Sequence, residues 1–301
     1  MITRFLLFAA TLASVLGAPA AIAEDAGALL WEVTSKSTTG YLLGTIHVGS
    51  PAMYPLPRVI EDAYSRARII ALEADPTDQS ALMMAMGSGM YEPPETLESN
   101  VPPALFDDVR RLFAANGLPL ELARVMKPYM VAMTLAMTEV GRLGLDVSLG
   151  VDMHLAARAH QDGKSIVELE SMAMQLAMLD AMSRETQVAM LDNTVQGLHS
   201  GTLKRDLEAM IAAWRAGDAR RMDDAAMRDL KSMPPRAGRD LKEAMFDRRN
   251  SAMADKIVQL LAGSEVILVG VGAGHMTGPT GIVELLRARG FSVRRLPGEA
   301  R

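Results

Sequence analysis

The sequence predicts an α/β (α+β) protein whose central sheet is built from strands at both ends of the chain, with a large helical insertion between them. Short apolar and β-branched runs typical of buried strands lie before residue 74 and after residue 264. Between about residues 79 and 262, apolar residues repeat at helical spacing, interrupted by Gly and Pro. Since no internal repeat or low-complexity linker divides the chain, we expect a single domain from residue 24 to 301.

The first 23 residues have the composition of a cleavable export signal. Arg4 is their only charged residue, an apolar run extends from Phe5 to Leu16, and the small-residue triplet Ala21-Ile22-Ala23 follows. A positive start, a short apolar core and an A-x-A end are the three parts of a secretory signal. The run is shorter than the roughly 20 residues that span a bilayer, so an uncleaved anchor is the weaker alternative. We expect cleavage after Ala23 and a periplasmic or secreted protein with no further membrane attachment.

The composition excludes several kinds of site and partner. With 49% hydrophobic and 22% charged residues, the chain has a normal globular balance. Removing the signal removes one of 31 basic residues and none of 36 acidic ones, which leaves a formal charge of −6. This acidic balance argues against nucleic acid and anionic membrane surfaces as partners. Because cysteine is absent, disulfides, thiol nucleophiles and thiolate metal sites are excluded, and any metal must be held by His and carboxylates.

The N-terminal elements are expected to be a hairpin, a helix and a buried strand. Leu29–Thr34 and Gly40–His47 are strand-like runs on either side of the polar turn Ser35–Thr39. Pro57 is well placed to begin a helix. The short apolar run Arg68–Glu73 predicts a buried strand that ends in a carboxylate.

In the helical insertion, Pro and Gly mark the ends of the predicted helices. Asn100 is expected to be an N-cap, with Pro102 or Pro103 starting a helix that ends at Gly117. The remaining expected elements are, in order, a helix from Pro128, a helix over Gly150–His160 closed by Gly163, a strand over Lys164–Glu170, helices from Ser171 to Leu261 with breaks at Gly201, Gly217 and Pro234-Pro235, a strand over Glu265–Val271, a helix over Gly281–Arg289 and a strand over Phe291–Leu296.

Methionine is abundant, with 23 residues, and Met126, Met130, Met133 and Met137 follow a helical spacing. Methionine fills irregular gaps in protein cores, and its thioether is also a ligand for Cu(I). Copper sites usually gather Met with His in loops, whereas this stripe lies within an expected amphipathic helix. We therefore interpret the stripe as core packing.

Two segments place a histidine after the end of an apolar strand. Gly44-Thr45-Ile46-His47 and Gly272-Ala273-Gly274-His275 are both Gly-x-x-His units. Open α/β sheets build their sites at the carboxyl ends of strands, and Gly allows the backbone to approach a ligand closely. Glu73 also follows a predicted strand directly. We therefore expect His47, Glu73 and His275 to converge.

Two imidazoles and one carboxylate form a recognised divalent-metal arrangement, with open positions for water and substrate. Such a metal lowers the pKa of bound water and polarises a carbonyl group. Without a metal, the same side chains could act as general acid and base, because His titrates near neutral pH. An alternative for Glu73 is structural, namely an ion pair with a buried arginine, for which Arg249 is the candidate.

Two further segments carry weaker signals. Glu168 and Glu170 lie two apart in a strand-like stretch and share a face, either in the site or on a polar strand surface. Arg248-Arg249-Asn250 precedes a helix, either as part of the site or as exposed helix charge. Three histidines on predicted helices have no partner at ligand spacing and are interpreted as structural or surface residues: His154, His160 and His199.

Together, these segments resemble the TraB/GumN family, which includes PrgY and the Tiki proteases. The resemblance implies a fold related to erythromycin esterases and haem-binding ChaN-like proteins. It also implies that the two Gly-x-x-His motifs and an acidic residue form an active site, which in Tiki-type members is a divalent-metal-dependent protease site. The matching segments occur in the family's order over nearly all of the mature chain: Gly44–His47 with Tyr54–Pro57, Leu72–Asp75, Gly150–Asp152, Leu169–Ser171 with Gln175, Arg249-Asn250 with Met253-Ala254, and Val271–His275.

The resemblance implies a function and a set of site residues. We expect an exported hydrolase, a peptidase, that uses Mn, Co or Zn on a peptide or small-molecule substrate. The alternative is a non-catalytic periplasmic protein that sequesters a signalling peptide or haem in the same cleft. Arg248 is a departure, since relatives often have an acidic residue at this position. The site residues carried over from the family are the expected metal ligands His47, Glu73 and His275, with Glu170, Arg249 and Asn250 as supporting residues.

Overall fold

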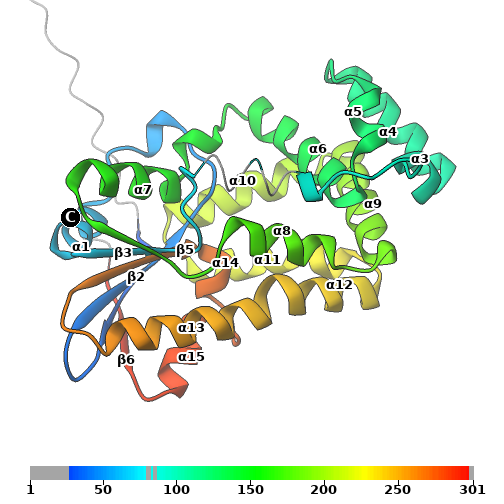
Figure 1. Cartoon of the computed structure of the whole chain (residues 1–301). Helices are drawn as coiled ribbons and strands as arrows, with labels where there is room; N and C mark the ends of the chain where they lie inside the picture. The colour runs from blue at the N-terminus through cyan, green and yellow to red at the C-terminus, as the bar shows by residue number, and fades with distance from the viewer. Residues whose placement is uncertain (1–26, 79–82, 84–86, 298–301) are drawn as a thin grey trace, which may run out of the picture.

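The computed structural model describes residues 27–78, 83 and 87–297. The predicted export signal lies outside these residues, as does the expected start of the helical insertion at residue 79. The described chain forms one six-stranded sheet with a large helical region beside it (Figure 1), which confirms the predicted fold class. In the part of the chain that the structure describes, no helix has the length and apolar character needed to span a membrane.

Parallel strands form the centre of the sheet, in the order β4-β3-β5-β2-β1-β6. Strands β4, β3, β5 and β2 are parallel, whereas β1 pairs antiparallel with both β2 and β6. Every predicted strand and the predicted hairpin are confirmed, with ends that differ by at most two residues. The bounds are β1 (Leu30–Thr34), β2 (Thr39–Thr45), β3 (Ile69–Leu72), β4 (Ser165–Glu168), β5 (Ile267–Gly272) and β6 (Ser292–Arg295).

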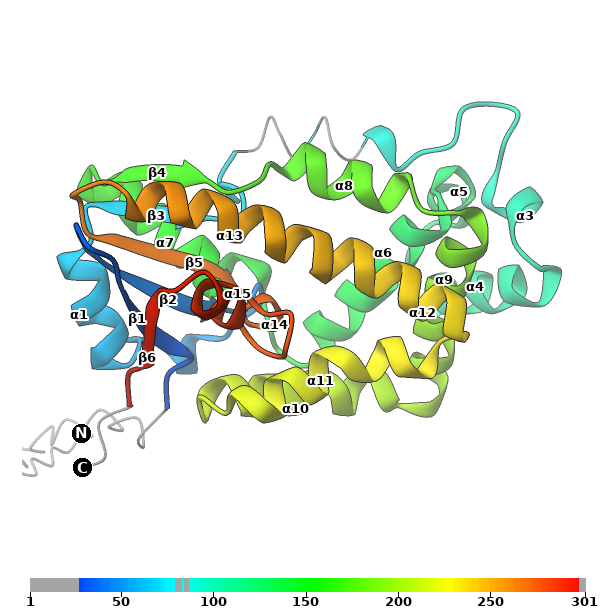
Figure 2. The same cartoon turned by 90° about the horizontal axis from the view of Figure 1, so that it is seen from below.

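The central strand β5 is buried along its whole length, as expected for a parallel strand covered on both faces. Helix α7 (Val151–Asp162) covers one face of the sheet, and α13 (Arg248–Leu261) and α15 (Ile282–Ala288) cover the other (Figure 1 and Figure 2). The edge strands β4 and β6 are more exposed. The core of this layer therefore lies between α7, the sheet and α13.

The remaining helices lie mostly beyond the carboxyl edge of the parallel strands (Figure 2). The described α-helices are α1 (Arg58–Arg66), α3 (Leu97–Asn100), α4 (Pro103–Ala115), α5 (Leu120–Val125), α6 (Pro128–Arg142), α8 (Met172–Asp180), α9 (Arg184–Ser200), α10 (Thr202–Arg215), α11 (Ala219–Ser232), α12 (Pro235–Lys242) and α14 (Ala273–Met276). Short 3-10 turns cover Pro51–Met53 and Val147–Leu149, and a π-helical turn, η3 (Glu243–Asp247), joins α12 to α13.

Most helix ends follow the sequence signals, but α1 begins one residue after Pro57, and an unpredicted break at residues 181–183 separates α8 from α9. Gly117 and Gly163 adopt left-handed conformations with φ of 68° and 64°, and they end α4 and α7 as predicted. The prediction for Asn100 is wrong, because Asn100 is the last residue of α3 rather than an N-cap. The N-cap of α3 is Thr96, four residues before the expected N-cap, and Thr96 forms a capping box with Ser99.

Three apolar clusters stabilise the described chain, one around the sheet, a second within the helical region and a small third one at α12, made of Met233, Ala237 and Leu241. Met126 and Met130 are buried in the second cluster, as the core-packing interpretation requires. Met133 and Met137 are 42% and 46% exposed, so the interpretation is wrong for these two residues. The helical spacing therefore does not correspond to one helix face, because Met126 is the C-cap of α5 while the other three methionines lie in α6.

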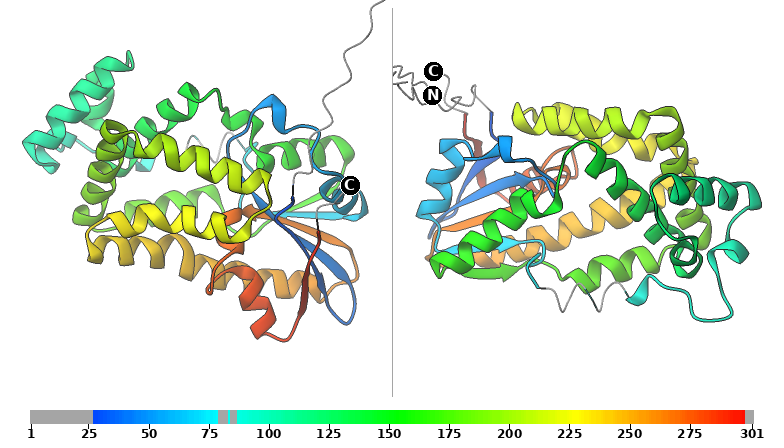
Figure 3. Two further views of the ribbon diagram at one scale, coloured as in Figure 1. Left: turned by 180° about the vertical axis from the view of Figure 1, so that it is seen from behind. Right: turned by 90° about the horizontal axis from the view of Figure 1, so that it is seen from above.

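Helices α10 and α11 lie side by side between the sheet and the far end of the helical region (Figure 3). The chain approaches the sheet along α10 and leaves it along α11. At the sheet, the indole Nε1 of Trp214 donates a buried hydrogen bond of 2.8 Å to the carbonyl oxygen of Gly44. This bond fixes the helical region to the first Gly-x-x-His segment.

Candidate functional site

The parallel strands end in register, and their carboxyl ends carry the three residues predicted to converge. Thr45 at the end of β2 pairs with Gly272 at the end of β5, and Leu72 at the end of β3 pairs with Gly270. His47, Glu73 and His275 therefore follow three adjacent strands at one edge of the sheet. The structure brings these side chains together.

The three side chains surround Gly272. A Cβ atom added to Gly272 would lie 3.1 Å from Oε1 of Glu73, 3.2 Å from Nε2 of His47 and 3.6 Å from Cδ2 of His275. Nε2 of His275 itself lies 3.9 Å from Oε1 of Glu73. Glycine at this position thus leaves a small space between two imidazoles and one carboxylate, which any other residue would fill.

His275 is buried, and Asn250 fixes its ring. Nδ1 of His275 lies 2.6 Å from Oδ1 of Asn250, while Nδ2 of Asn250 donates to the carbonyl oxygen of Thr280 at 2.8 Å. Since the amide nitrogen of Asn250 is already a donor, its oxygen must accept the proton of Nδ1, which leaves Nε2 with a free lone pair. Burial lowers the pKa of His275 to about 4, so the ring is neutral at pH 7.

His47 is held in the same way by Asp152, which lies in the first turn of α7. Nδ1 of His47 is 3.0 Å from Oδ2 of Asp152, and 60% of the His47 side chain is exposed. Desolvation on the inner side of the ring opposes protonation of His47. The hydrogen bond and negative charge of Asp152 outweigh it and raise the pKa of His47 to about 9. Sequence analysis did not include Asp152 among the site residues, although Gly150–Asp152 was among the family-like segments.

Arg249 lies between the two buried glutamates. Its Nη2 donates to Oε2 of Glu73 at 2.6 Å and to Oε2 of Glu170 at 2.7 Å, and its Nε donates to Oε2 of Glu170 at 2.9 Å. All three side chains are 11% exposed or less. Gln175, a second residue that sequence analysis left out of the site, donates through Nε2 to both carboxylates at 3.1 and 3.3 Å. The structural alternative for Glu73, an ion pair with Arg249, is therefore present.

The ion pair leaves one oxygen of Glu73 facing the histidines. Oε1 of Glu73 accepts the backbone N–H of Gly272 at 2.6 Å and no other hydrogen bond from the described residues. Burial opposes ionisation of Glu73, but the two histidines, Arg249 and the Gly272 N–H outweigh it and lower its pKa to about 2. Glu73 is therefore a charged carboxylate that takes part in the ion pair and also lies beside the histidines.

All six residues expected in the site lie in this one network, whereas the neighbouring Arg248 does not. Arg248 points to solvent and pairs with Glu243 at 2.7 Å, so the departure from the family pattern lies outside the network. The other three histidines fit the structural or surface interpretation: His154 packs against the ring of Tyr54, His160 bonds to Asp75, and His199 is exposed.

The donor chemistry suits a divalent metal. Both histidines have Nδ1 held by an oxygen acceptor, the usual support for a metal-binding imidazole. Nε2 of His47 faces the space at Gly272, and Nε2 of His275 lies 3.9 Å from Oε1 of Glu73. Metal bonds to N and O ligands are about 2.0–2.2 Å long, and no three His, Asp or Glu side chains of the described residues are yet gathered that closely. Binding a metal would therefore require His47, Glu73 and His275 to close on that space.

Comparison with known proteins gives a family match over most of the chain. The model of the TraB/PrgY/gumN family matches residues 29–295. The uncharacterized protein YbaP of Escherichia coli is 27% identical over 247 residues, which cover 82% of this chain and 87% of the relative. Metalloprotease TIKI1 of Danio rerio is 20% identical over 318 aligned residues, which cover 91% of this chain and 64% of the relative. No solved structure matches, so the expected relation to erythromycin esterases and ChaN-like proteins stays a prediction.

Arg249→Met should destabilise the protein much more than Glu73→Gln. The first change leaves two buried carboxylates without their cation and should cost about 3–5 kcal/mol. The second leaves Arg249 paired with Glu170 and should cost about 1 kcal/mol. Glu170→Gln is the matched control, since it leaves Arg249 paired with Glu73. Urea denaturation of metal-free protein measures all three, and equal losses in Arg249→Met and Glu73→Gln would contradict the shared role of the guanidinium.

The lowered pKa of His275 predicts a loss of stability in mild acid. Between pH 6.5 and about 4 the unfolded chain protonates this imidazole while the folded protein does not. The free energy of unfolding of metal-free protein should therefore fall as the pH is lowered through this range, by up to about 3 kcal/mol from His275. His275→Gln should remove this part of the pH dependence. Urea denaturation at several pH values tests it, and parallel curves for wild type and variant would rule it out.

Proposed function

Because the chain belongs to the TraB/PrgY/gumN family, we propose that it is an exported, metal-dependent hydrolase that cleaves peptides. The observation that carries the proposal is the convergence of His47, Glu73 and His275 on the space beside Gly272. Relatives named metalloproteases, TIKI1 and TIKI2, align with 91% of this chain, which supports a proteolytic activity.

In this proposal His47, Glu73 and His275 hold Mn, Co or Zn. A bound metal of this kind lowers the pKa of water and polarises a carbonyl group. Two of the expected ligands are already in the protonation state that binds a metal, because neutral His275 presents the free Nε2 and ionised Glu73 presents Oε1. His47 must lose a proton before it can bind a metal, and its exposed ring is the side from which a substrate would approach.

The neighbouring residues have positioning roles. Asp152 and Asn250 orient the two imidazole rings, and Arg249 together with Gln175 holds Glu73. Glu170 acts through Arg249, because the described contacts of its carboxylate are with Arg249 and Gln175. The alternative of a non-catalytic binding protein needs no ionised carboxylate beside the free Nε2, so the pairing of Glu73 with the histidines favours the hydrolase.

A metal-supplemented peptide-cleavage assay tests the proposal. Wild-type protein should cleave members of a peptide library with Mn²⁺, Co²⁺ or Zn²⁺, and a chelator should abolish cleavage. Gly272→Ala should lose metal binding and activity, since its Cβ would lie 3.1 Å from Glu73 Oε1 and 3.2 Å from His47 Nε2. Gly270→Ala is the matched control, because its Cβ would lie 3.1 and 3.2 Å from the apolar side chains of Leu72 and Leu155. Peptides that bind but stay intact with every metal would support the binding protein instead.

We propose that the mature protein works in the periplasm or is secreted. The support is the sequence of the first 23 residues, with one positive charge, an apolar run and an Ala-x-Ala end. Mass spectrometry of protein from the envelope or the medium should find a chain that begins at Glu24. An intact Met1 terminus on membrane-bound protein would contradict export by signal cleavage.

A further inference from the structure

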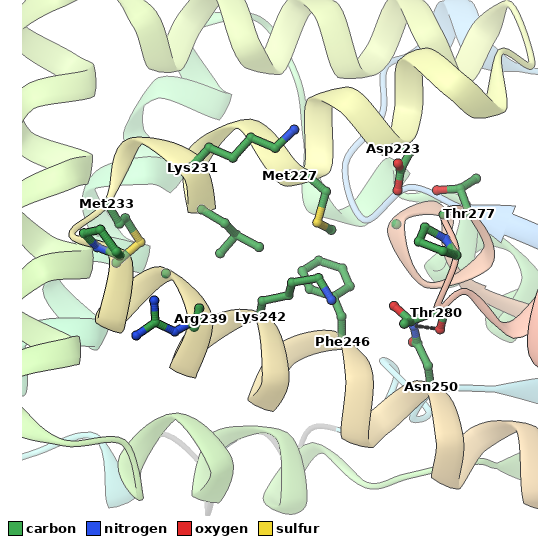
Figure 4. A pocket seen from close by; sticks show the side chains of 16 residues that line it. Asp223, Met227, Lys231, Met233, Arg239, Lys242, Phe246, Asn250, Thr277 and Thr280 are labelled. Carbon is green, nitrogen blue, oxygen red and sulfur yellow. Dashed lines mark hydrogen bonds between the residues drawn. The ribbon is translucent and has the colours of Figure 1, made fainter.

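A cavity of about 480 Å³ lies between α11 and the continuous helical rod formed by α12, η3 and α13 (Figure 4). We call it the α11–α12 cavity. Its lining includes Asn250 but none of the histidine or glutamate side chains of the site described above. Phe246, whose ring lies 5.2 Å from that of His275, forms part of the wall between the two. The cavity is thus adjacent to the histidine cluster and separate from it.

The cavity is elongated. Along the rod its lining residues follow one another at intervals of one to four and share one face from Pro235 to Asn250, a length of up to about 22 Å at 1.5 Å per residue. The cavity therefore suits an elongated ligand that lies along the rod.

The walls of the cavity are mainly apolar. Both helices contribute, with Met227 from α11 facing Phe246 from the rod (Figure 4), and Leu230 of α11 also lines the cavity. Only Met233 and Pro234 separate α11 from α12, so the two helices meet at one end of the cavity. Residues 277–280 of the loop after α14 form the other end. Such a lining favours a hydrocarbon group, and methionine side chains can adapt to its shape.

Basic side chains line the cavity in an otherwise acidic chain, whose formal charge is −5. Lys231 from α11 and Arg239 from α12 lie on opposite walls, with Arg239 near Met233 and the Lys231 side chain directed toward Met227 (Figure 4). Neither has an ion pair with another described residue, whereas Lys242 is neutralised by Asp247 at 2.6 Å. Lys231 and Arg239 are exposed, and their charges favour an anionic group between them.

We propose that the α11–α12 cavity binds a single-chain carboxylic acid, such as a fatty acid, with the chain along Met227, Leu230 and Phe246 and the carboxylate between Lys231 and Arg239. The far end of the chain then reaches Asn250 and Thr280. These two residues fix the ring of His275, so the ligand lies directly behind a residue of the histidine cluster. The proposal does not depend on hydrolase activity.

Calorimetry with dodecanoate, below its micelle concentration, tests the proposal on the metal-free, full mature chain. Dodecanoate should bind saturably with one site per chain, and dodecanol and dodecylammonium should bind more weakly. A chain with ¹⁵N-labelled histidine should show a shift of the His275 ring signals on binding, while those of His199 stay unchanged. No saturable binding of dodecanoate would overturn the proposal, and equal binding of the alcohol or the amine would overturn the role of the carboxylate.

Three variants locate the binding site. Met227→Trp should fill the cavity and abolish binding. The double change Lys231→Ala and Arg239→Ala should weaken dodecanoate binding roughly tenfold, as expected for two exposed ion pairs. Arg220→Ala, which removes an exposed charge of α11 outside the lining, is the control and should bind as wild type does. Thermal melts confirm that each variant folds. A folded Met227→Trp protein that binds dodecanoate with wild-type affinity would place the site elsewhere and overturn the proposal.

Discussion

The buried guanidinium of Arg249 is the interaction on which the rest of the site depends. It joins three segments that are far apart in the sequence, namely the end of β3, the residues after β4 and the start of α13. Two carboxylates this deeply buried would be very costly without a cation and several hydrogen bonds. Because Arg249 and Gln175 satisfy Oε2 of Glu73, Oε1 stays directed at the histidines and the N–H of Gly272.

One turn of α13 supports both halves of the site. Consecutive residues of a helix point about 100° apart, so Arg249 and Asn250 reach different partners. Arg249 turns to the two glutamates, and Asn250 turns to His275. The π-helical turn just before them includes Met245, whose carbonyl oxygen accepts a hydrogen bond of 3.3 Å from Nη1 of Arg249. Irregular helix geometry of this kind often occurs at functional sites, and here it helps to fix the direction of the arginine.

Much of the fold could be predicted because its signals are local. The strands are short apolar runs, and parallel strand ends must meet at one edge, so the meeting of His47, Glu73 and His275 followed from their places after β2, β3 and β5. Residues that reach the site only through tertiary contacts have no such local signal in the sequence. Asp152 is an ordinary acidic residue at a helix start until α7 packs beside His47. The sequence alone does not decide whether Glu73 binds a metal or pairs with an arginine. It also gives no signal for the α11–α12 cavity, because that cavity depends on how two helices diverge.

The order of the strands in the sheet has a consequence for when the site can exist. Strand β5 lies between β2 and β3, although the ribosome makes it long after both of them. Until β5 arrives, those two strands have unpaired edges and no Gly272 lies between the histidine and the glutamate that follow them. Pairing between such distant segments forms slowly, because a long loop must close first. A nascent chain therefore carries no assembled site until β5 has been made and has paired with β2 and β3.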